Sequence, residues 1–134
     1  MNSIILLLSM IFLHIVDDFY SQPIILSNLK QKSWWKENAP DKQYAQDYLA
    51  AMIIHAFSWT FMIHIPLVAG LWLTNTITKV NWEGFVIIFL SNLLVHFYTD
   101  NLKANKFKLN LIQDQCIHLF QIIITWIIYL GIFK

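Results

Sequence analysis

The stretch SIILLLSMIFLHIVDDFYSQ, residues 3–22, begins as an apolar run and ends with a histidine and two aspartates among its last nine residues. About 20 apolar residues can cross a bilayer as a helix, so the stretch predicts a membrane-spanning helix. It is not typical of a secretory signal peptide, because it lacks a basic N-terminal region and carries Asp17 and Asp18 where cleavage would occur. Charged groups at membrane depth are costly, so His14 and Asp18 need a partner there.

The composition is that of a small integral membrane protein. Of the 134 residues, 57% are hydrophobic and 13% are charged, which lies outside the range of ordinary soluble domains. The formal net charge is +1 and every cation is a lysine. The chain therefore has neither a strongly basic surface nor arginines that could clamp phosphate groups. We expect no nucleic-acid partner. Cys116 is the single cysteine, so no intramolecular disulfide forms.

Four apolar segments are long enough to span a bilayer. They cover residues 3–22, 48–74, 82–101 and 109–131. Two of their connectors are short, which favours antiparallel neighbours. The sequence therefore predicts an all-α, four-helix transmembrane bundle that forms one domain over residues 1–134, surrounded by membrane lipids. Its oligomeric state is left open.

The connector between the first two segments is expected to lie along the membrane interface. It starts with the apolar stretch PIILSNL, residues 23–29, and continues with lysines and two tryptophans, Trp34 and Trp35. Tryptophan and lysine commonly anchor a chain at the level of the lipid headgroups.

The lysines predict the orientation in a bacterial inner membrane. Those of the first and third connectors are Lys30, Lys32, Lys36, Lys42, Lys103, Lys106 and Lys108. The opposite side has only Lys79 and Lys134. Because positive residues gather on the cytoplasmic side, both termini are predicted to lie outside the cytoplasm.

Histidines and aspartates in the four segments are predicted to meet at one depth. In the first and third segments a histidine precedes an aspartate by four residues, and in the fourth segment the order is reversed. Since the fourth segment runs in the opposite direction, the reversal brings the groups to one level. The second segment adds a histidine at a comparable level. The members are His14, Asp18, His55, His96, Asp100, Asp114 and His118.

These residue types indicate a divalent metal site. Imidazole nitrogens and carboxylate oxygens bind zinc, manganese or iron, of which zinc is the first expectation. Seven groups exceed the four positions of one tetrahedral zinc, so either two ions bind or some acids are not ligands. The general-base candidates are Asp18, Asp100 and Asp114. The candidates for orienting site residues or contacting a substrate are Gln22, Lys103 and Gln115.

Three nearby polar residues are weighed separately. His64 lies about 180° around its helix from His55 and is expected to stay outside the site, where it makes a local hydrogen bond near Pro66 or meets the outer membrane interface. Asp17 is about 100° from Asp18, and its role stays open. Ser58 is a conceivable nucleophile, but helix packing is the preferred interpretation.

The motifs HIVDDFYSQ, HFYTDNLK and DQCIH resemble those of a small bacterial and phage membrane family, domain of unknown function 3307. That family has a histidine with D-F-x-x-Q, a second histidine, H-x-x-x-D-x-x-K and D-Q-x-x-H on successive helices. The matching positions here are His14, Asp18, Phe19, Gln22, His55, His96, Asp100, Lys103, Asp114, Gln115 and His118. The resemblance covers essentially the whole chain and implies a fold and a motif set, but no activity.

Three functions follow from these expectations. The first is a metal-dependent membrane hydrolase with a pocket open to the cytoplasmic side and a lipid-linked or phosphorylated substrate, although enzyme activity itself is left open. The second is a transporter or channel that conducts protons or metal ions. The third is a structural or partner-binding membrane protein of a bacterium or phage. If they carry neither a metal ion nor protons, the histidine and aspartate pairs would only join helices, at about 1 kcal/mol each.

Overall fold

The computed structural model describes residues 2–133, apart from the side chains of Lys79 and Phe133. Within that range the chain forms helices and no strands, which confirms the all-α prediction. Two lysines in the orientation prediction are affected by these limits: the side chain of Lys79 and the whole of Lys134 lie outside the described residues.

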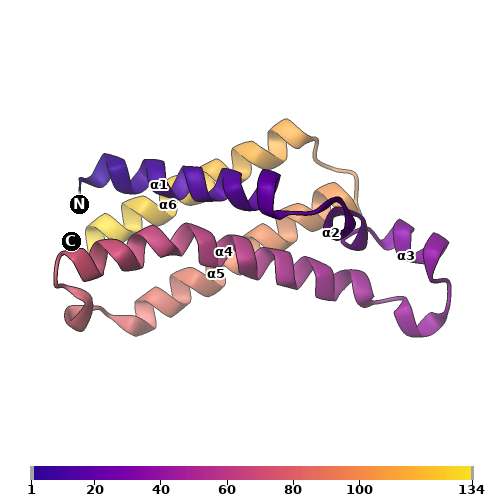
Figure 1. Ribbon diagram of the computed structural model, residues 1–134, viewed down its shortest axis with the longest axis horizontal. Helices are drawn as coiled ribbons and strands as arrows, with labels where there is room; N and C mark the ends of the chain where they lie inside the picture. The colour runs from indigo at the N-terminus through magenta and orange to yellow at the C-terminus, as the bar shows by residue number, and fades with distance from the viewer. Residues whose placement is uncertain (1, 134) are drawn as a thin grey trace.

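Four long helices run side by side, and both termini lie at one end of the molecule (Figure 1). They are α1 (Ser3–Ile15) with its continuation η1 (Val16–Ser21), α4 (Asp47–Leu73), α5 (Trp82–Ala104) and α6 (Leu111–Phe133). Each is long and apolar enough to cross a membrane. Helix α4 packs against α1 and α5, and α6 packs against the same two helices. The four helices therefore enclose a common interior.

The predicted interfacial connector contains two short helices, α2 (Ile24–Leu29) and α3 (Lys32–Asn38), at the end opposite the termini (Figure 1). Ile24 and Ile25 are exposed on α2. Trp35 donates its indole N–H to the carbonyl of Leu29 at 2.8 Å, which joins the two helices. Short 3-10 turns, η2 (Lys42–Tyr44) and η3 (Ile77–Lys79), complete the links before α4 and α5.

The polarity of the molecule is reversed relative to a soluble bundle. Large apolar side chains on the outside, such as Leu8, Ile54 and Leu94, are 59%, 63% and 64% exposed, whereas most of the buried polar groups lie between the helices. This distribution suits a lipid environment, because apolar side chains can face lipid and polar ones cannot. An apolar core fills the half nearer the termini: Leu6, Met10, Trp59, Ile63, Leu67, Leu71, Ile122 and Tyr129.

The last part of the first long helix differs from the expectation of a regular helix through residue 22. Residues Val16–Ser21 form a π-helix, and Gln22 is extended. A π-helix hydrogen-bonds over five residues instead of four, so its wider turn lets Asp17 as well as Asp18 face the interior. The helix stops before Pro23 because a residue that precedes proline disfavours the helical conformation.

Candidate metal centre

The seven predicted site residues come together in the half of the bundle nearer the connector. His14 lies on α1, Asp18 on η1 and His55 on α4, while α5 and α6 each supply two members. All are buried except Asp18, which is partly exposed. The members from α5 and α6 are His96, Asp100, Asp114 and His118. Four helices thus contribute to one cluster.

Asp100 lies at the centre of the cluster. Its Oδ1 is 3.7 Å from Nε2 of His96 and 3.4 Å from Nε2 of His118. Its Oδ2 is 3.5 Å from Nε2 of His55. His118 Nε2 is also 3.4 Å from Asp114 Oδ1. A single carboxylate therefore faces imidazoles from three directions.

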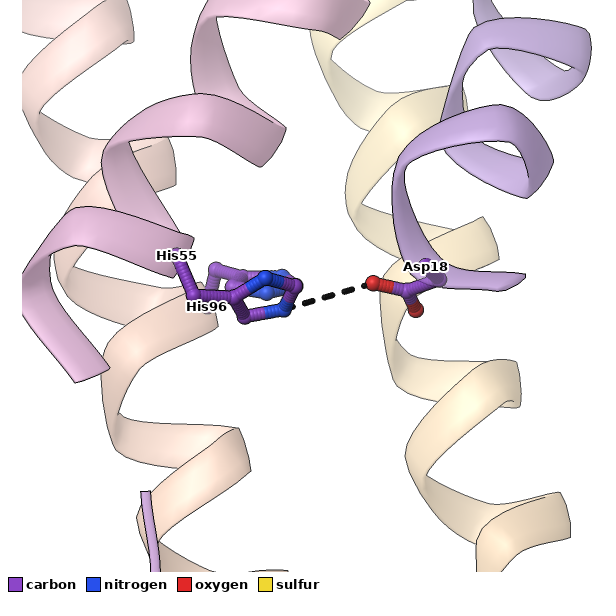
Figure 2. Close-up of side chains that lie close together, drawn as sticks. All are labelled: Asp18, His55 and His96. Atoms are coloured by element: carbon purple, nitrogen blue, oxygen red, sulfur yellow. Dashed lines mark ion pairs between the residues drawn. The ribbon is translucent and has the colours of Figure 1, made fainter. Parts of the chain in front are cut away.

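Asp18 closes the cluster from the first long helix. Figure 2 shows its carboxylate facing the rings of His55 and His96, and its Oδ1 is 3.4 Å from His55 Nε2. Two sets of three ligand atoms each lie within 4.8 Å of one another: the set of Asp18, His55 and His96, and the set of His96, Asp100 and His118. Because a neutral imidazole offers one lone pair, His96 can complete only one of these sets at a time.

Several buried atoms of the cluster have no hydrogen-bond partner among the described residues. They are Asp18 Oδ1, Asp114 Oδ1 and both ring nitrogens of His96 and of His118. An unsatisfied buried polar atom costs about 1–3 kcal/mol, so such a concentration needs an explanation. Ligation would satisfy one nitrogen of each ring and Asp18 Oδ1, whereas Asp114 Oδ1 belongs to neither set of ligand atoms. The donor set therefore fits a divalent metal ion.

The charge balance agrees with that fit. Four acids face the site, Asp17, Asp18, Asp100 and Asp114, and two of them are paired with lysines. With every acid and lysine ionised and the imidazoles neutral, four negative charges against two positive ones leave two negative charges. Buried charge requires compensation, and one divalent ion supplies it.

Hydrogen bonds assign His14 a different environment from the other three histidines. The indole of Trp59, which can only donate, gives its N–H to His14 Nδ1 at 2.7 Å. His14 Nε2 then carries the proton and donates it to Gln115 Oε1 at 3.0 Å. The amide of Gln115 donates in turn to Asp18 Oδ2 at 2.9 Å. Both nitrogens of His14 are engaged, so this histidine orients Gln115 and offers no lone pair to a metal ion.

Asp17 and Ser58 form a contact behind His55. Ser58 donates its hydroxyl to Asp17 Oδ1 at 2.6 Å, and Asp17 Oδ2 lies 3.8 Å from His55 Nδ1. A carboxylate on the far side of a ligating imidazole commonly fixes the ring and its tautomer. The sequence left the role of Asp17 open because a regular helix separates it from Asp18 by about 100°. In the structure both lie in the wider turn of the π-helix, and both contact His55.

Trp59 is a further site residue that sequence reasoning missed. It is fully buried, stacks on His96 with ring centroids 4.2 Å apart, and lies 5.4 Å from the ring of His118. Because it also belongs to the apolar core, it separates the cluster from the half nearer the termini. Its position one turn from His55 was the available signal, but a large aromatic side chain on an apolar helix ordinarily packs in the core, so the signal is weak.

Two lysines cover the cluster at the connector end. Lys103 donates to Asp114 at 2.6 Å and not to Asp100, the partner that helix periodicity favours. Asp100 instead accepts from Lys30 at 2.7 Å, and Lys30 also donates to Gln22 at 3.1 Å. The sequence indicates a role for Lys30 only in the orientation of the connector, because nothing in it shows that the connector folds back over the bundle.

A pocket of about 300 Å³ opens at this end. Its polar wall includes all three general-base candidates and all three residues expected to orient the site or contact a substrate. His96 and His118 are not among the lining residues and lie beneath it. The polar residues of the wall are Asp18, Gln22, Ser27, Lys30, Gln31, His55, Lys103, Asp100, Asp114 and Gln115.

Toward the termini, α5 and α6 are joined by further polar contacts, and Gln121 Oε1 has no partner among the described residues. Asn92 donates to Thr125 at 2.8 Å, and Gln121 donates to the carbonyl of Asn92 at 2.7 Å. His64, which sequence analysis placed outside the site, contacts the carbonyl of Thr60 at 2.7 Å through Nδ1, a local hydrogen bond as expected. Beyond these groups lies the apolar core, so the pocket has one polar opening.

No protein-family model, curated protein or solved structure matches the chain. The resemblance to domain of unknown function 3307 stays a prediction.

Proposed function

We propose that the protein is an integral membrane protein that binds a divalent metal ion, with zinc as the first expectation and manganese or iron as alternatives, and acts as a metal-dependent hydrolase. The observation that carries the proposal is the convergence of unpartnered imidazole and carboxylate atoms from four helices beneath an open polar pocket. A purely structural cluster would need no pocket. In pairs that only join helices, the buried polar atoms would also be expected to have hydrogen-bond partners. Several imidazole and carboxylate atoms of this cluster have none among the described residues.

The residues divide into roles by their contacts. The ligand atoms come from the two sets described above. One set consists of Asp100, His96 and His118, and the other includes Asp18 and His55. When bound, the metal ion supplies a Lewis acid and lowers the pKa of a bound water toward neutrality.

Asp114 is the proposed general base among the three candidates. It belongs to neither set of ligand atoms, it lines the pocket, and its Oδ1 has no hydrogen-bond partner. A base must reach the proton that it removes, and only a carboxylate oxygen left free by the ligand sets can do so.

The transporter is the second candidate function. It is favoured by the position of His118 Nε2, which lies 3.4 Å from both Asp100 and Asp114 and could pass a proton between them. Conduction needs polar groups that continue across the membrane. Here the hydrogen-bonded set of Asn92, Gln121 and Thr125 is followed by the apolar core, which favours a closed pocket.

Metal analysis of detergent-purified protein tests the proposal. We expect at least one equivalent of metal in the wild type after incubation with zinc, manganese or ferrous iron, and little in His118→Ala or Asp100→Asn. The matched control is His64→Ala, which removes a buried histidine outside the cluster and should keep the metal. Well-folded wild type without stoichiometric metal would contradict the metal-dependent functions.

Two further measurements separate the remaining functions. Flux of protons or metal ions into proteoliposomes, lost in His118→Ala, would support the transporter and overturn the hydrolase. An ion with no exchangeable water, seen by relaxation of solvent protons around bound manganese, would assign the metal a structural role.

A further inference from the structure

The mouth of the candidate metal centre contains unused hydrogen-bond donors. Lys30 donates to Gln22 and Asp100, and Lys103 donates to Asp114. Each ammonium group carries three N–H donors. Among the contacts of the described residues, three of these six N–H groups are used, and three remain for a ligand in the pocket.

Lys30 is held in this position by its backbone. The side-chain amide of Asn105 donates to the carbonyl of Lys30 at 3.1 Å, and its oxygen accepts from the amide of Lys32 at 2.7 Å. These bonds attach the connector to the C-terminal end of α5. Lysines near a membrane surface ordinarily extend to water, but Lys30 is only 7% exposed. Its ammonium group is therefore fixed at the pocket.

The pocket also has an apolar edge. Phe19, Phe107 and Leu111 line it together with the polar residues, and all three side chains are exposed on the outside of the molecule. The pocket thus combines a polar floor, two cations and an apolar edge at the end of helices that can span a membrane. This combination suits a lipid whose head enters the pocket while its chains stay outside.

We propose that Lys30 and Lys103 bind the phosphate monoester of a membrane lipid, which names the substrate class of the proposed hydrolase and rests on that function. Ammonium groups are strong donors to phosphate oxygens, and the three remaining N–H groups equal the three terminal oxygens of a monoester. Asp100 connects the two parts of the site, because Oδ2 contacts Lys30 while Oδ1 faces His96 and His118. A phosphate held by the lysines lies beside the ligand atoms.

Lipid binding by metal-loaded protein in nanodiscs tests the proposal. The probes are dioleoyl phosphatidic acid, dioleoyl phosphatidylcholine and inorganic phosphate. We expect phosphatidic acid to bind at least tenfold more tightly than phosphatidylcholine or inorganic phosphate. Lys30→Met and Lys103→Met should each weaken its binding about tenfold. The matched controls Lys36→Met and Lys106→Met change exposed lysines at the same end of the bundle and should have no effect.

The same samples distinguish failure of the phosphate proposal from failure of the metal proposal. If the lysine variants keep their metal and bind phosphatidic acid like the wild type, the phosphate proposal is overturned and the metal-dependent function stands. If inorganic phosphate binds as tightly as phosphatidic acid and depends on the same lysines, the site recognises free phosphate, and the proposed lipid substrate is overturned. If the wild type holds no metal, the hydrolase fails, and lysine-dependent binding of phosphatidic acid would support the phosphate site alone.

Discussion

His96 and His14 differ in their hydrogen bonds, and the metal hypothesis therefore gives them different roles. His96 has two unpartnered ring nitrogens, whereas both nitrogens of His14 are engaged by Trp59 and Gln115. We expect His96→Ala to abolish metal binding. His14→Ala should weaken it about 10–100-fold, as is usual when a residue behind the ligands is removed. Competition with a chromogenic chelator measures both effects.

Trp59→Phe provides the control for that comparison. It removes the indole donor to His14 and keeps an aromatic ring beside His96. Metal affinity should fall less than in His14→Ala. Loss of metal in His14→Ala as complete as in His96→Ala would show that His14 is itself a ligand and that the assigned proton positions are wrong.

Asp17 gives a second prediction at the level of single residues. Its carboxylate is buried between Ser58 and His55 and has one oxygen without a partner. Asp17→Asn keeps the size but removes the charge that would hold the proton on His55 Nδ1. We expect metal affinity to fall about 10–100-fold. Ser58→Ala should lower the metal affinity in the same way but more weakly. The control Ser91→Ala changes an exposed serine and should leave the affinity unchanged. An unchanged affinity in Asp17→Asn would contradict the role of Asp17 in orienting His55.

Single residues also show how far the sequence could predict the site. The seven members of the cluster follow from helix periodicity and chain direction, because both fix which side chains share a face and a depth. Lys30 does not follow from either, and periodicity places Trp59 on the face of His55 without indicating a role in the site. Lys30 reaches the site through the fold of a connector, and Trp59 resembles the many apolar residues around it.

At the level of elements, the first long helix is the main departure from a regular pattern. A uniform 100° per residue separates Asp17 from Asp18, and no local sequence signal announces a π-helix. The change of helix type depends on tertiary contacts, since Asp17 bonds to Ser58 on α4 and Asp18 bonds to Gln115 on α6. π-helices are rare overall, but those that occur are often found at functional sites. The π-helix here contributes Asp18 to the candidate metal centre, which agrees with that tendency.

The connector yields the prediction at this scale. Asn105 bonds to the carbonyl of Lys30 and to the amide of Lys32. Asn105→Ala should remove about 2 kcal/mol from the local opening free energy, since each of the two lost hydrogen bonds contributes about 1 kcal/mol. Hydrogen exchange at residues 30–32 should accelerate roughly 30-fold. Asn38→Ala, which removes a bond only to Trp34 within α3, should leave exchange at residues 30–32 unchanged; equal acceleration in both variants would rule out the role of Asn105.

For the whole molecule, the helical class and the approximate bounds of the long helices could be predicted from hydropathy alone. Apolar length decides whether a helix can span a bilayer, and Leu8, Ile54 and Leu94 face outward as that interpretation requires. The fold of the connector could not be predicted in the same way. Its short helices are joined to each other by the bond of Trp35 to Leu29, and they are attached to the bundle by Asn105, which is distant from them in the sequence.

Orientation in the membrane gives the last prediction. Six lysines lie on the connectors at one end of the molecule, and a seventh, Lys103, lies in the last turn of α5 at the same end. Positive residues favour the cytoplasmic side. Because the chain has one cysteine, Cys116→Ser gives a background for single-cysteine variants in a bacterial inner membrane. Ser33→Cys on α3 and Thr78→Cys on η3 both replace exposed residues, one at each end of the bundle.

A membrane-impermeant maleimide added to spheroplasts should label Thr78→Cys and spare Ser33→Cys, which should react only after the membrane is opened. The reverse pattern would place the connector, and with it the pocket that contains Lys30 and Lys103, outside the cytoplasm. A phosphorylated lipid would then have to reach the site from the outer leaflet. The labelling pattern therefore decides which leaflet must contain the proposed substrate, and the lipid-binding variants can then be tested with that lipid in the corresponding leaflet.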